Sequence, residues 1–283
     1  MASEDTRSEP LQTKMLFRRD PEFNSEVDMA KKAGFSLTFN RTNPILRDSF
    51  VIGRYSVLPY YNELDDDLFY SNCKLINTVR QHNYIANFDY YHDVKDYTFE
   101  TWFDHDFPLS NYTGPFVVKG KTNSKKGSWK SLMFAPDRKS AINIACDLRE
   151  DSLIGDQGII YRKFEPLKTF EYGLNDLPFT NEWRFFFLGQ KLVDYGYYWS
   201  NATDMAKSSA VIDYEGTSFA FSIAEIISQK ANFFVLDIAE KASGGWILVE
   251  VNDAQMSGLS TIDEERFYRR LAECSGDLSS LLF

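Results

Sequence analysis

Alternating apolar and polar residues predict two β-hairpins in the C-terminal half of the chain. The first, NEWRFFFLGQKLVDYGYYW over residues 181–199, turns at Gly189 and Gln190, as short hairpins do. The second joins NFFVLDIAE (232–240) to GWILVEVND (245–253) across the turn KASGG. Apolar residues at helical spacing predict helices over about 138–149, 217–230 and 263–274. Hairpins and helices in separate runs indicate an α+β fold.

The preceding part of the chain divides into segments of different character. Residues 1–45 are mostly polar and predict a loosely ordered arm with a short helical piece at 29–33. Residues 46–113 are rich in Tyr, Phe, Asp and Asn, with a strand-like VIGRYSVLPYY and a helix near 77–82. From residue 114 the pattern changes: PFVVKGK and SLMFA predict a hairpin around the basic loop TNSKKGSWKS. A further strand, QGIIYRKF, follows at 157–164.

Composition limits the class of protein. Hydrophobic residues make up 43% of the 283 residues and aromatic residues 16%, which indicates a folded globular chain. No apolar run approaches the roughly 18 residues of a membrane-spanning helix, and the polar start lacks the apolar core of a secretory signal. Three scattered cysteines form no CxxC pair, which favours neither a zinc site nor a disulfide framework. We therefore expect a cytoplasmic protein.

The net charge of −10 disfavours a broad nucleic-acid interface. Against that acidic background, five lysines fall within a span of twelve residues in and around the basic loop. The cluster consists of Lys119, Lys121, Lys125, Lys126 and Lys130. Backbone amides and lysines of such a loop can bind phosphate oxygens, although the spacing matches neither GxxxxGK[ST] nor GxGxxG. A solvated basic turn is the alternative.

Polar residues interrupt the last hairpin where a buried strand should be apolar. Glu250 and Asn252 share one strand face by parity, and Asp237 interrupts the opposing strand. The loop length allows Asp237 to lie opposite Leu248, one step from Glu250. Buried carboxylates must protonate, pair or bind a cation, and oxygen ligands suit magnesium. The alternative is that Asp237 or Glu250 forms an ion pair with Lys or Arg.

Two arginines lie on partly buried strand faces. Glu182, Arg184 and Phe186 share one face, and Arg162 shares another with its neighbours at i±2. Each guanidinium can pair with a carboxylate or bind a phosphate with two parallel hydrogen bonds, and the sequence leaves both open. The three histidines lack metal-ligand spacing and are predicted to be structural. Trp129, Tyr197, Tyr198 and Trp199 are candidates to line a pocket, with core packing as the alternative.

Taken in order, these segments resemble the ATP-grasp superfamily. The resemblance is carried by the strand ending in lysine, the small-residue loop, GIIYRKFEPL, NEWRFFFLGQKLV, FFVLDIAE and ILVEVNDAQMSG, and it covers about residues 114–260. The residues of these segments are most similar to the divergent phage and bacterial R-two-K clade. That clade is related to a eukaryotic cell-division-cycle protein that assembles a translation initiation factor. The resemblance implies two α+β lobes that grip ATP, over 114–170 and 171–283, behind a pre-ATP-grasp region at 46–113.

The resemblance also implies roles for individual residues. Lys119 would hold ATP phosphates under a flexible lid running from Lys121 to Ser128, and Arg184 would contact the terminal phosphate or acyl-phosphate. Backbone groups of Lys163, Phe164 and Glu165 would meet adenine. Arg162 replaces the Gln or Glu common in the family, so a phosphate or substrate contact is expected there instead. The predicted magnesium ligands are Asp237, Glu250 and Asn252. The lysine that usually precedes the first lobe has no clear counterpart, and Lys74 is the candidate.

The implied function is ATP- and Mg²⁺-dependent ligation of a carboxylate to an amine through an acyl-phosphate. The substrates, whether small molecules, peptides or proteins, cannot be named from the sequence. The alternative is an ATP-binding assembly factor or chaperone that uses the fold without ligation. The segment DAQMSGL after the last strand is a candidate wall of the acceptor pocket.

Overall fold

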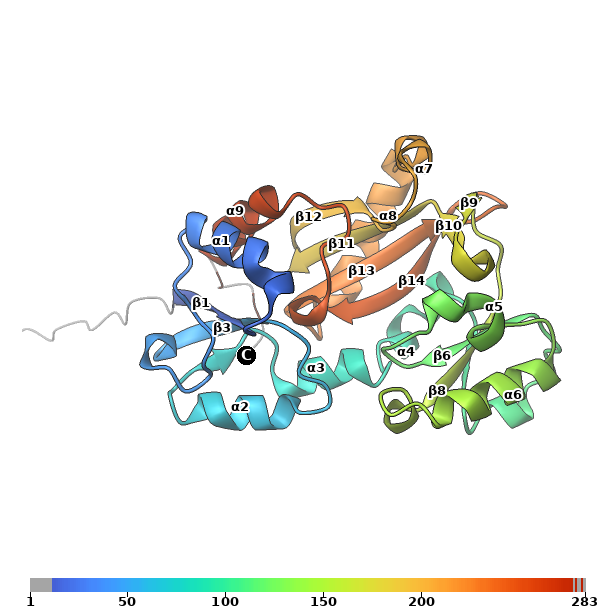
Figure 1. The fold of residues 1–283 in the computed structure, drawn as a ribbon, viewed down its shortest axis with the longest axis horizontal. Coiled ribbons are helices and arrows are strands. Elements are labelled where there is room, and N and C mark those ends of the chain that lie inside the picture. The colour runs from blue at the N-terminus through green and yellow to red at the C-terminus, as the bar shows by residue number, and fades with distance from the viewer. Residues whose placement is uncertain (1–11, 277, 279–280, 282–283) are drawn as a thin grey trace, which may run out of the picture.

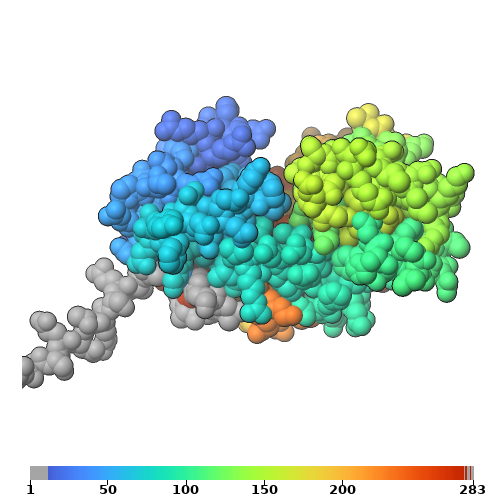
Figure 2. Space-filling model, turned by 90° about the horizontal axis from the view of Figure 1, so that it is seen from below, coloured from blue at the N-terminus to red at the C-terminus, as the bar shows by residue number. Residues whose placement is uncertain are grey.

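The computed structural model describes residues 12–276, 278 and 281. They form three parts, a first domain, an N-lobe and a C-lobe, which lie side by side (Figure 1). Seen from below, the blue first domain and the green N-lobe stand as separate masses with a furrow between them (Figure 2). In the part of the chain described, no helix combines the length and the apolar character needed to cross a membrane.

The first domain is built on a small parallel sheet with strand order β2-β1-β3-β4. Its elements are β1 (Gln12–Phe17), α1 (Asn24–Lys32), β2 (Leu37–Thr38), β3 (Ser49–Arg54), α2 (Tyr61–Phe69) and β4 (Lys74–Leu75). Helix α1 packs on the face that carries Met15 and Ile52, and α2 packs on the face that carries Leu16 and Val51. Side chains of neighbouring residues point to opposite faces, so the sheet is buried on both sides.

The expectation of a loosely ordered arm over 1–45 is wrong for residues 12–45. Met15, Leu16 and Phe17 are buried, and β1 is an inner strand of the sheet. The apolar run MLF is short and stands among charged residues, so the pattern alone does not show that the strand is covered on both faces. Residues 1–11 of the predicted arm lie outside the described residues.

The N-lobe has an antiparallel sheet with strand order β5-β8-β6-β7. Its strands are β5 (Thr101–Phe103), β6 (Phe116–Gly120), β7 (Phe134–Ala135) and β8 (Ile159–Lys163). Helix α6 (Arg138–Arg149) covers one face with its predicted apolar stripe. The start of the predicted strand SLMFA is instead helical, in α5 (Trp129–Leu132). Since β5 belongs to this sheet, the lobe begins before residue 114.

The C-lobe contains both predicted hairpins in one antiparallel sheet with order β12-β11-β13-β14. Its strands are β11 (Glu182–Leu188), β12 (Lys191–Tyr197), β13 (Phe233–Glu240) and β14 (Trp246–Asp253). Helix α8 (Tyr214–Ile227) covers one face, and α9 (Glu264–Ser275) covers part of the other. The remaining elements are α3 (Val79–Ala86), α4 (Tyr91–Val94), the small hairpin of β9 (Thr169–Tyr172) and β10 (Pro178–Thr180), and α7 (Asp204–Ser209).

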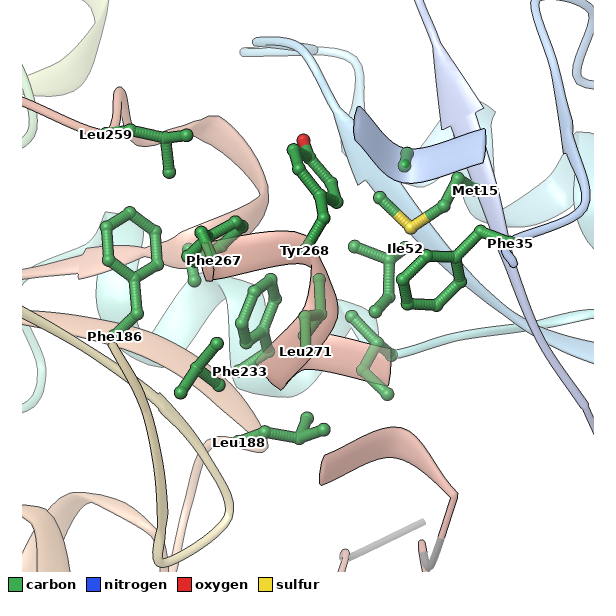
Figure 3. Close-up of a cluster of buried hydrophobic side chains, with 14 of the residues drawn as sticks. Met15, Phe35, Ile52, Phe186, Leu188, Phe233, Leu259, Phe267, Tyr268 and Leu271 are labelled. Carbon is green, nitrogen blue, oxygen red and sulfur yellow. The ribbon is translucent and has the colours of Figure 1, made fainter. Parts of the chain in front are cut away.

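Helix α9 lies between the C-lobe sheet and the first domain and joins them in one hydrophobic core. Phe267 and Leu271 of α9 meet Phe233 on the sheet side, while Ile52 and Met15 approach from the first domain (Figure 3). Asp263 begins the helix by accepting a hydrogen bond from the Arg266 amide, as a good N-cap does. The last helix thus fixes the orientation of the first domain on the C-lobe.

Polar contacts reinforce the same interface around the end of β14. The fully buried guanidinium of Arg54 donates to Glu26, at 2.7 Å, and to the backbone oxygens of Ala254 and Ser257, at 2.7 and 2.9 Å. His82 Nδ1 lies 3.0 Å from an Asp253 oxygen, in the structural role expected of it. These contacts hold the segment that leads from β14 into residues 254–260.

Candidate functional site

A cavity lies between the N-lobe and the C-lobe, and both contribute to its walls. In Figure 1 the N-lobe strands β6 and β8 lie below β14. Apolar side chains such as Phe99, Val117, Trp129 and Trp199 form much of the lining. The charged residues that line it are Lys119, Lys126, Arg162, Lys163, Glu165, Glu182 and Glu250. An apolar cavity with a few convergent charges is typical of a small-molecule site. We call it the interlobe cavity.

Lys119 at the end of β6 reaches across the cavity to Glu250 on β14. Lys119 Nζ lies 2.9 Å from a Glu250 carboxylate oxygen, and both side chains are largely buried. Burial opposes ionisation of Glu250, but the positive charges of Lys119, Lys126 and Arg162 outweigh it and lower the pKa of Glu250. Burial lowers the pKa of Lys119, and the nearby Arg162 and Lys126 add to that effect against the pull of Glu250. The Glu250 carboxylate therefore faces several cations, and their positive charge favours the binding of a further anion.

Arg184 and Asp237 form a second buried ion pair on the same sheet face. The guanidinium donates to both Asp237 oxygens at 2.8 Å and to the Gly258 oxygen at 2.8 Å. Asn252 Nδ2 donates to Asp237 at 3.2 Å, so the three predicted metal ligands do share one surface. The expected register is wrong by two residues, because Asp237 lies opposite Glu250 instead of Leu248. The hairpin turn is one residue longer than expected, so that Leu248 pairs with Ile238, and a bulge between Asp237 and Ile238 adds the second residue.

Lys126 is the lid residue that enters the cavity. Its Nζ lies 4.1 Å from the centre of the Tyr198 ring and 5.1 Å from that of Trp199, a geometry that favours a cation over an aromatic face. Burial opposes its charge, yet Tyr198, Glu182 and Glu250 raise the pKa of Lys126. The lysine therefore stays protonated inside the protein.

The two lid residues singled out from the sequence do not line the interlobe cavity, whereas Ser124 and Lys126 do. Lys121 Nζ lies 5.9 Å from the Phe103 ring centre, and the Ser128 backbone belongs to a short 3-10 turn that accepts a bond from Ser131. Strand parity gives no guidance within a loop, so the only sequence signal for Lys126 was its place in the basic cluster. Lys74 is exposed on β4, in the first domain.

Arg162 joins the two lobes. From β8 its guanidinium donates to the Val249 oxygen of β14 at 2.6 Å and to the Thr98 hydroxyl at 2.7 Å. Its carbon Cζ lies 4.6 Å from the Phe99 ring centre. Burial lowers the pKa of this arginine. Its donors are thus directed to protein acceptors beside Glu250, and its charge reaches the cavity wall.

The segment after β8 supplies the far end of the cavity. Lys163, Phe164 and Glu165 all line it, as expected. The amides of Lys163 and Phe164 already donate to the oxygens of Glu100 and Pro115, at 2.8 and 3.0 Å. Within the described residues the Glu165 amide has no such protein acceptor. Of the three amides, it is the one available for a ligand.

Glu182 is an unusual carboxyl group in this setting. Its side chain is buried, and Oε1 has no hydrogen-bond partner in the part of the chain that the structure describes. Burial raises the pKa of Glu182 to about 7, with Lys126 opposing and Asp237 supporting the rise. An unpaired buried carboxylate costs free energy, so this atom is available to a ligand that can donate a hydrogen bond.

Comparison with known families shows to which family the chain belongs. The model of an ATP-grasp domain family, family 3 of the R-two-K clade, matches residues 107–271, more than half of the chain. The chain belongs to this ATP-grasp family. The fold and the clade predicted from the sequence are thereby confirmed. A search of curated proteins found no match.

Solved structures, an ATP-grasp ligase among them, share the fold across nearly the whole chain. D-cycloserine synthetase DcsG is similar at 11% identity and a TM-score of 0.59, covering 93% of this chain and 99% of that one. N5-carboxyaminoimidazole synthetase from Staphylococcus aureus, complexed with ADP, shows 11% identity and a TM-score of 0.60 over 94% and 77%. ATP-grasp ligase PsnB, complexed with a minimal precursor, Mg and ADP, shows 10% and 0.54 over 95% and 100%. At these identities the likeness is one of fold.

The strand face that carries Asp237 and Glu250 contains the ligand types that magnesium prefers. Glu250 lines the interlobe cavity, whereas Asp237 and Asn252 do not, and the two carboxylates are held by ion pairs with Lys119 and Arg184. Among the described residues no group of three His, Cys, Asp or Glu side chains gathers into a metal cluster. Asp237, Glu250 and Asn252 offer two carboxylates and one amide oxygen on one face. Magnesium is commonly held by one or two carboxylates together with substrate phosphates and water. The donor set therefore fits Mg²⁺ bound with a nucleotide, and not a site made by protein alone.

Proposed function

We propose that this chain is an ATP- and Mg²⁺-dependent ligase that joins a carboxylate to an amine through an acyl-phosphate. The observation that carries the proposal is the group of enclosed cations Lys119, Lys126 and Arg184 next to the carboxylates Glu250 and Asp237. Cations fixed in a water-poor site stabilise the charge of a transferring phosphoryl group. ATP-grasp ligase PsnB was solved with Mg and ADP, and N5-carboxyaminoimidazole synthetase with ADP, which supports the same ligands here.

In the first step a carboxylate oxygen of the substrate attacks the γ-phosphorus of ATP. The bond from that phosphorus to the β–γ bridging oxygen breaks, and ADP leaves with the electron pair. Lys119, Lys126 and Arg184 would stabilise the phosphoryl oxygens. Asp237, Glu250 and Asn252 would hold Mg²⁺, which when bound neutralises phosphate charge.

In the second step a neutral amine attacks the acyl carbon of the acyl-phosphate. The carbon–oxygen bond to phosphate breaks, the amide forms, and the amine proton leaves with hydrogen phosphate. At the other end of the cavity, the backbone amide of Glu165 and the apolar wall around Phe164 would receive the adenine ring. We assign Arg162 to holding the lobes together beside the phosphates, since its hydrogen bond runs from β8 of the N-lobe to the Val249 oxygen of β14 in the C-lobe.

The proposal is tested by trapping the acyl-phosphate with hydroxylamine, which replaces the natural amine. ATP, Mg²⁺, hydroxylamine and a panel of carboxylic acids, including amino acids and peptides, are incubated with the chain. Hydroxamate, ADP and phosphate should form in equal amounts with at least one acid. Tight ATP binding without hydroxamate from any acid would instead support an assembly factor that uses ATP without ligation.

The metal assignment has its own test in Glu250→Gln. Loss of one carboxylate ligand should weaken Mg²⁺-dependent nucleotide binding by about 10-fold or more, measured by calorimetric titration of an ATP analogue with and without Mg²⁺. Glu273→Gln, a surface change on α9 next to Arg269, is the matched control. Unchanged Mg²⁺-dependent affinity in Glu250→Gln would remove Glu250 from the metal site.

A further inference from the structure

A second cavity of about 500 Å³ adjoins the interlobe cavity, within the size range of small-molecule sites. The two cavities share the side chains of Lys126, Leu177 and Trp199. The second continues past them to Arg184, Tyr198 and the exposed residues Ser200 and Asn201. We call it the side cavity. A group inside it would lie next to the cations that face the nucleotide phosphates in the proposed function.

The charges that line the side cavity all have one sign. Lys126 and Arg184 line it, and no acidic side chain does among the described residues. Both cations lie over the ring of Tyr198, with Nζ of Lys126 at 4.1 Å and Cζ of Arg184 at 4.7 Å from its centre. The Tyr198 ring therefore holds two positive groups close to the junction of the cavities. Asp237 pairs with Arg184 from outside the lining, so the cationic side of that pair faces the cavity. This arrangement favours an anion and disfavours an ammonium group.

The inner wall is apolar, and the outer edge carries polar side chains beside one exposed leucine. Phe179 and Trp199 stack with ring centres 5.0 Å apart, and both are buried. On the exposed side, Ser200 and Asn201 line it together with Leu174. A ligand with a carboxylate at one end, an apolar group in the middle and a polar group outward would match each part.

One wall of the side cavity is held in place from two directions. Gly258 and Ser260 line it, and the Gly258 oxygen accepts a hydrogen bond from Arg184. The buried Arg54 of the first domain holds the preceding residues through the oxygens of Ala254 and Ser257. The segment is thus fixed before any ligand arrives, as a preorganised wall should be.

From these observations we infer that the side cavity binds the carboxylate substrate, an acid carrying an apolar or aromatic group, and that it does not bind the amine. This inference rests on the proposed ligase function, which it deepens by assigning one substrate to one cavity. N-acetylphenylalanine and N-acetylleucine are suitable probe acids, and N-acetylglycine is the probe without an apolar group. Hydroxylamine again serves as the amine.

The test uses two substitutions that add a negative charge at exposed lining positions. Asn201→Asp and Leu174→Asp should each raise the KM for the probe acid by about 5-fold or more, while the KM for ATP stays within about 2-fold. The increase should shrink at high salt, because surface charges are screened. Asn83→Asp adds the same charge at an exposed position of α3, away from the lining residues, and should change neither KM.

The outcomes separate the inference from the function. Hydroxamate formation with an unchanged KM for the acid in both variants would overturn the side-cavity assignment and leave the ligase standing. A raised KM for hydroxylamine in place of the acid would also overturn it. If no acid gives hydroxamate, the ligase proposal fails. Thermal-shift measurements with the probe acids then test whether the side cavity binds them. A rise in Tm that Leu174→Asp abolishes would support an anion site there, and no rise would overturn it.

Discussion

Lys125 and Lys126 are neighbours in sequence with different surroundings. Lys125 pairs with Asp151 near the surface, whereas Lys126 is directed inward and lines both cavities. Lys126→Ala should weaken ATP binding by about 10- to 100-fold, the usual loss for a hydrogen bond to a charged group. Titration of an ATP analogue measures this, and Lys125→Ala is the control. Equal effects of the two substitutions would show that Lys126 acts only through general charge.

Glu182 makes stability depend on pH in an unusual direction. Its pKa is raised from 4.5 to about 7 in the folded chain. Below pH 4.5 the carboxyl is protonated in both states. Between about 4.5 and 7 the unfolded chain binds fewer protons than the folded one, so stability falls as pH rises. The full loss, up to about 3 kcal/mol, is reached above pH 7.

Glu182→Gln should therefore flatten that dependence. Urea unfolding at pH 5 and pH 8 should show a smaller fall in the free energy of unfolding than in the unchanged protein. Glu273→Gln, at an exposed position, should keep the original fall. If Glu182→Gln also kept it, the carboxyl would be ionised in the folded protein across this range.

At the scale of elements, α9 determines how the first domain is attached. Leu271→Ala removes a fully buried side chain from the core shared by α9, the C-lobe sheet and the first domain. A loss of about 2–5 kcal/mol in the free energy of unfolding is expected. Arg269→Ala, on the exposed side of the same helix, should cost much less. Urea unfolding followed by circular dichroism measures both, and similar losses would contradict the proposed packing.

The long, regular elements could be predicted from sequence because their patterns are complete. Helix α6 begins and ends where the apolar spacing placed it, and the hairpin turn at Gly189 is where alternation breaks. The first-domain sheet could not be predicted, since β2 and β4 have two residues each. Two residues cannot establish a period, and parallel pairing joins segments distant in the sequence.

The candidate site was predictable as a set of strand residues but not as a set of contacts. Parity put Glu250 and Asn252 on one face, and the structure agrees. Parity cannot show the bulge next to Asp237, nor that Arg184 and Lys119 turn to the two carboxylates. The sequence did not single out Lys126, because loops have no period and because its aromatic surroundings, Tyr198 and Trp199, come from the segment after β12, far along the chain.

At the scale of the whole molecule, the N-lobe has a core largely of its own. The buried members of that core lie between residues 107 and 161, whereas the α9 core combines residues from 15 to 271. The opening that lets amides of β6 and α6 exchange with solvent should therefore cost less free energy than the opening that exposes amides of β13. Hydrogen exchange read by mass spectrometry measures the difference. Equal protection in both would mean that the lobes open only together.

An ATP analogue with Mg²⁺ should reduce that difference. The ligand would contact walls from both lobes, so it binds only when the N-lobe is closed and folded. Protection of β6 and α6 should rise with ligand concentration more than protection of the first domain does. Glu250→Gln should abolish the rise at the same concentration, whereas Glu273→Gln should retain it.

The shared core of α9 also affects the order in which the chain is made. Met15 and Leu271 belong to one cluster but are separated by about 250 residues. At about 5–20 residues per second of synthesis, strand β1 leaves the ribosome roughly 10 to 50 seconds before the helix that covers it. During that time one face of the first-domain sheet lacks its final partner. A nascent chain halted before α9 should therefore be a good client for chaperones that bind exposed apolar surface.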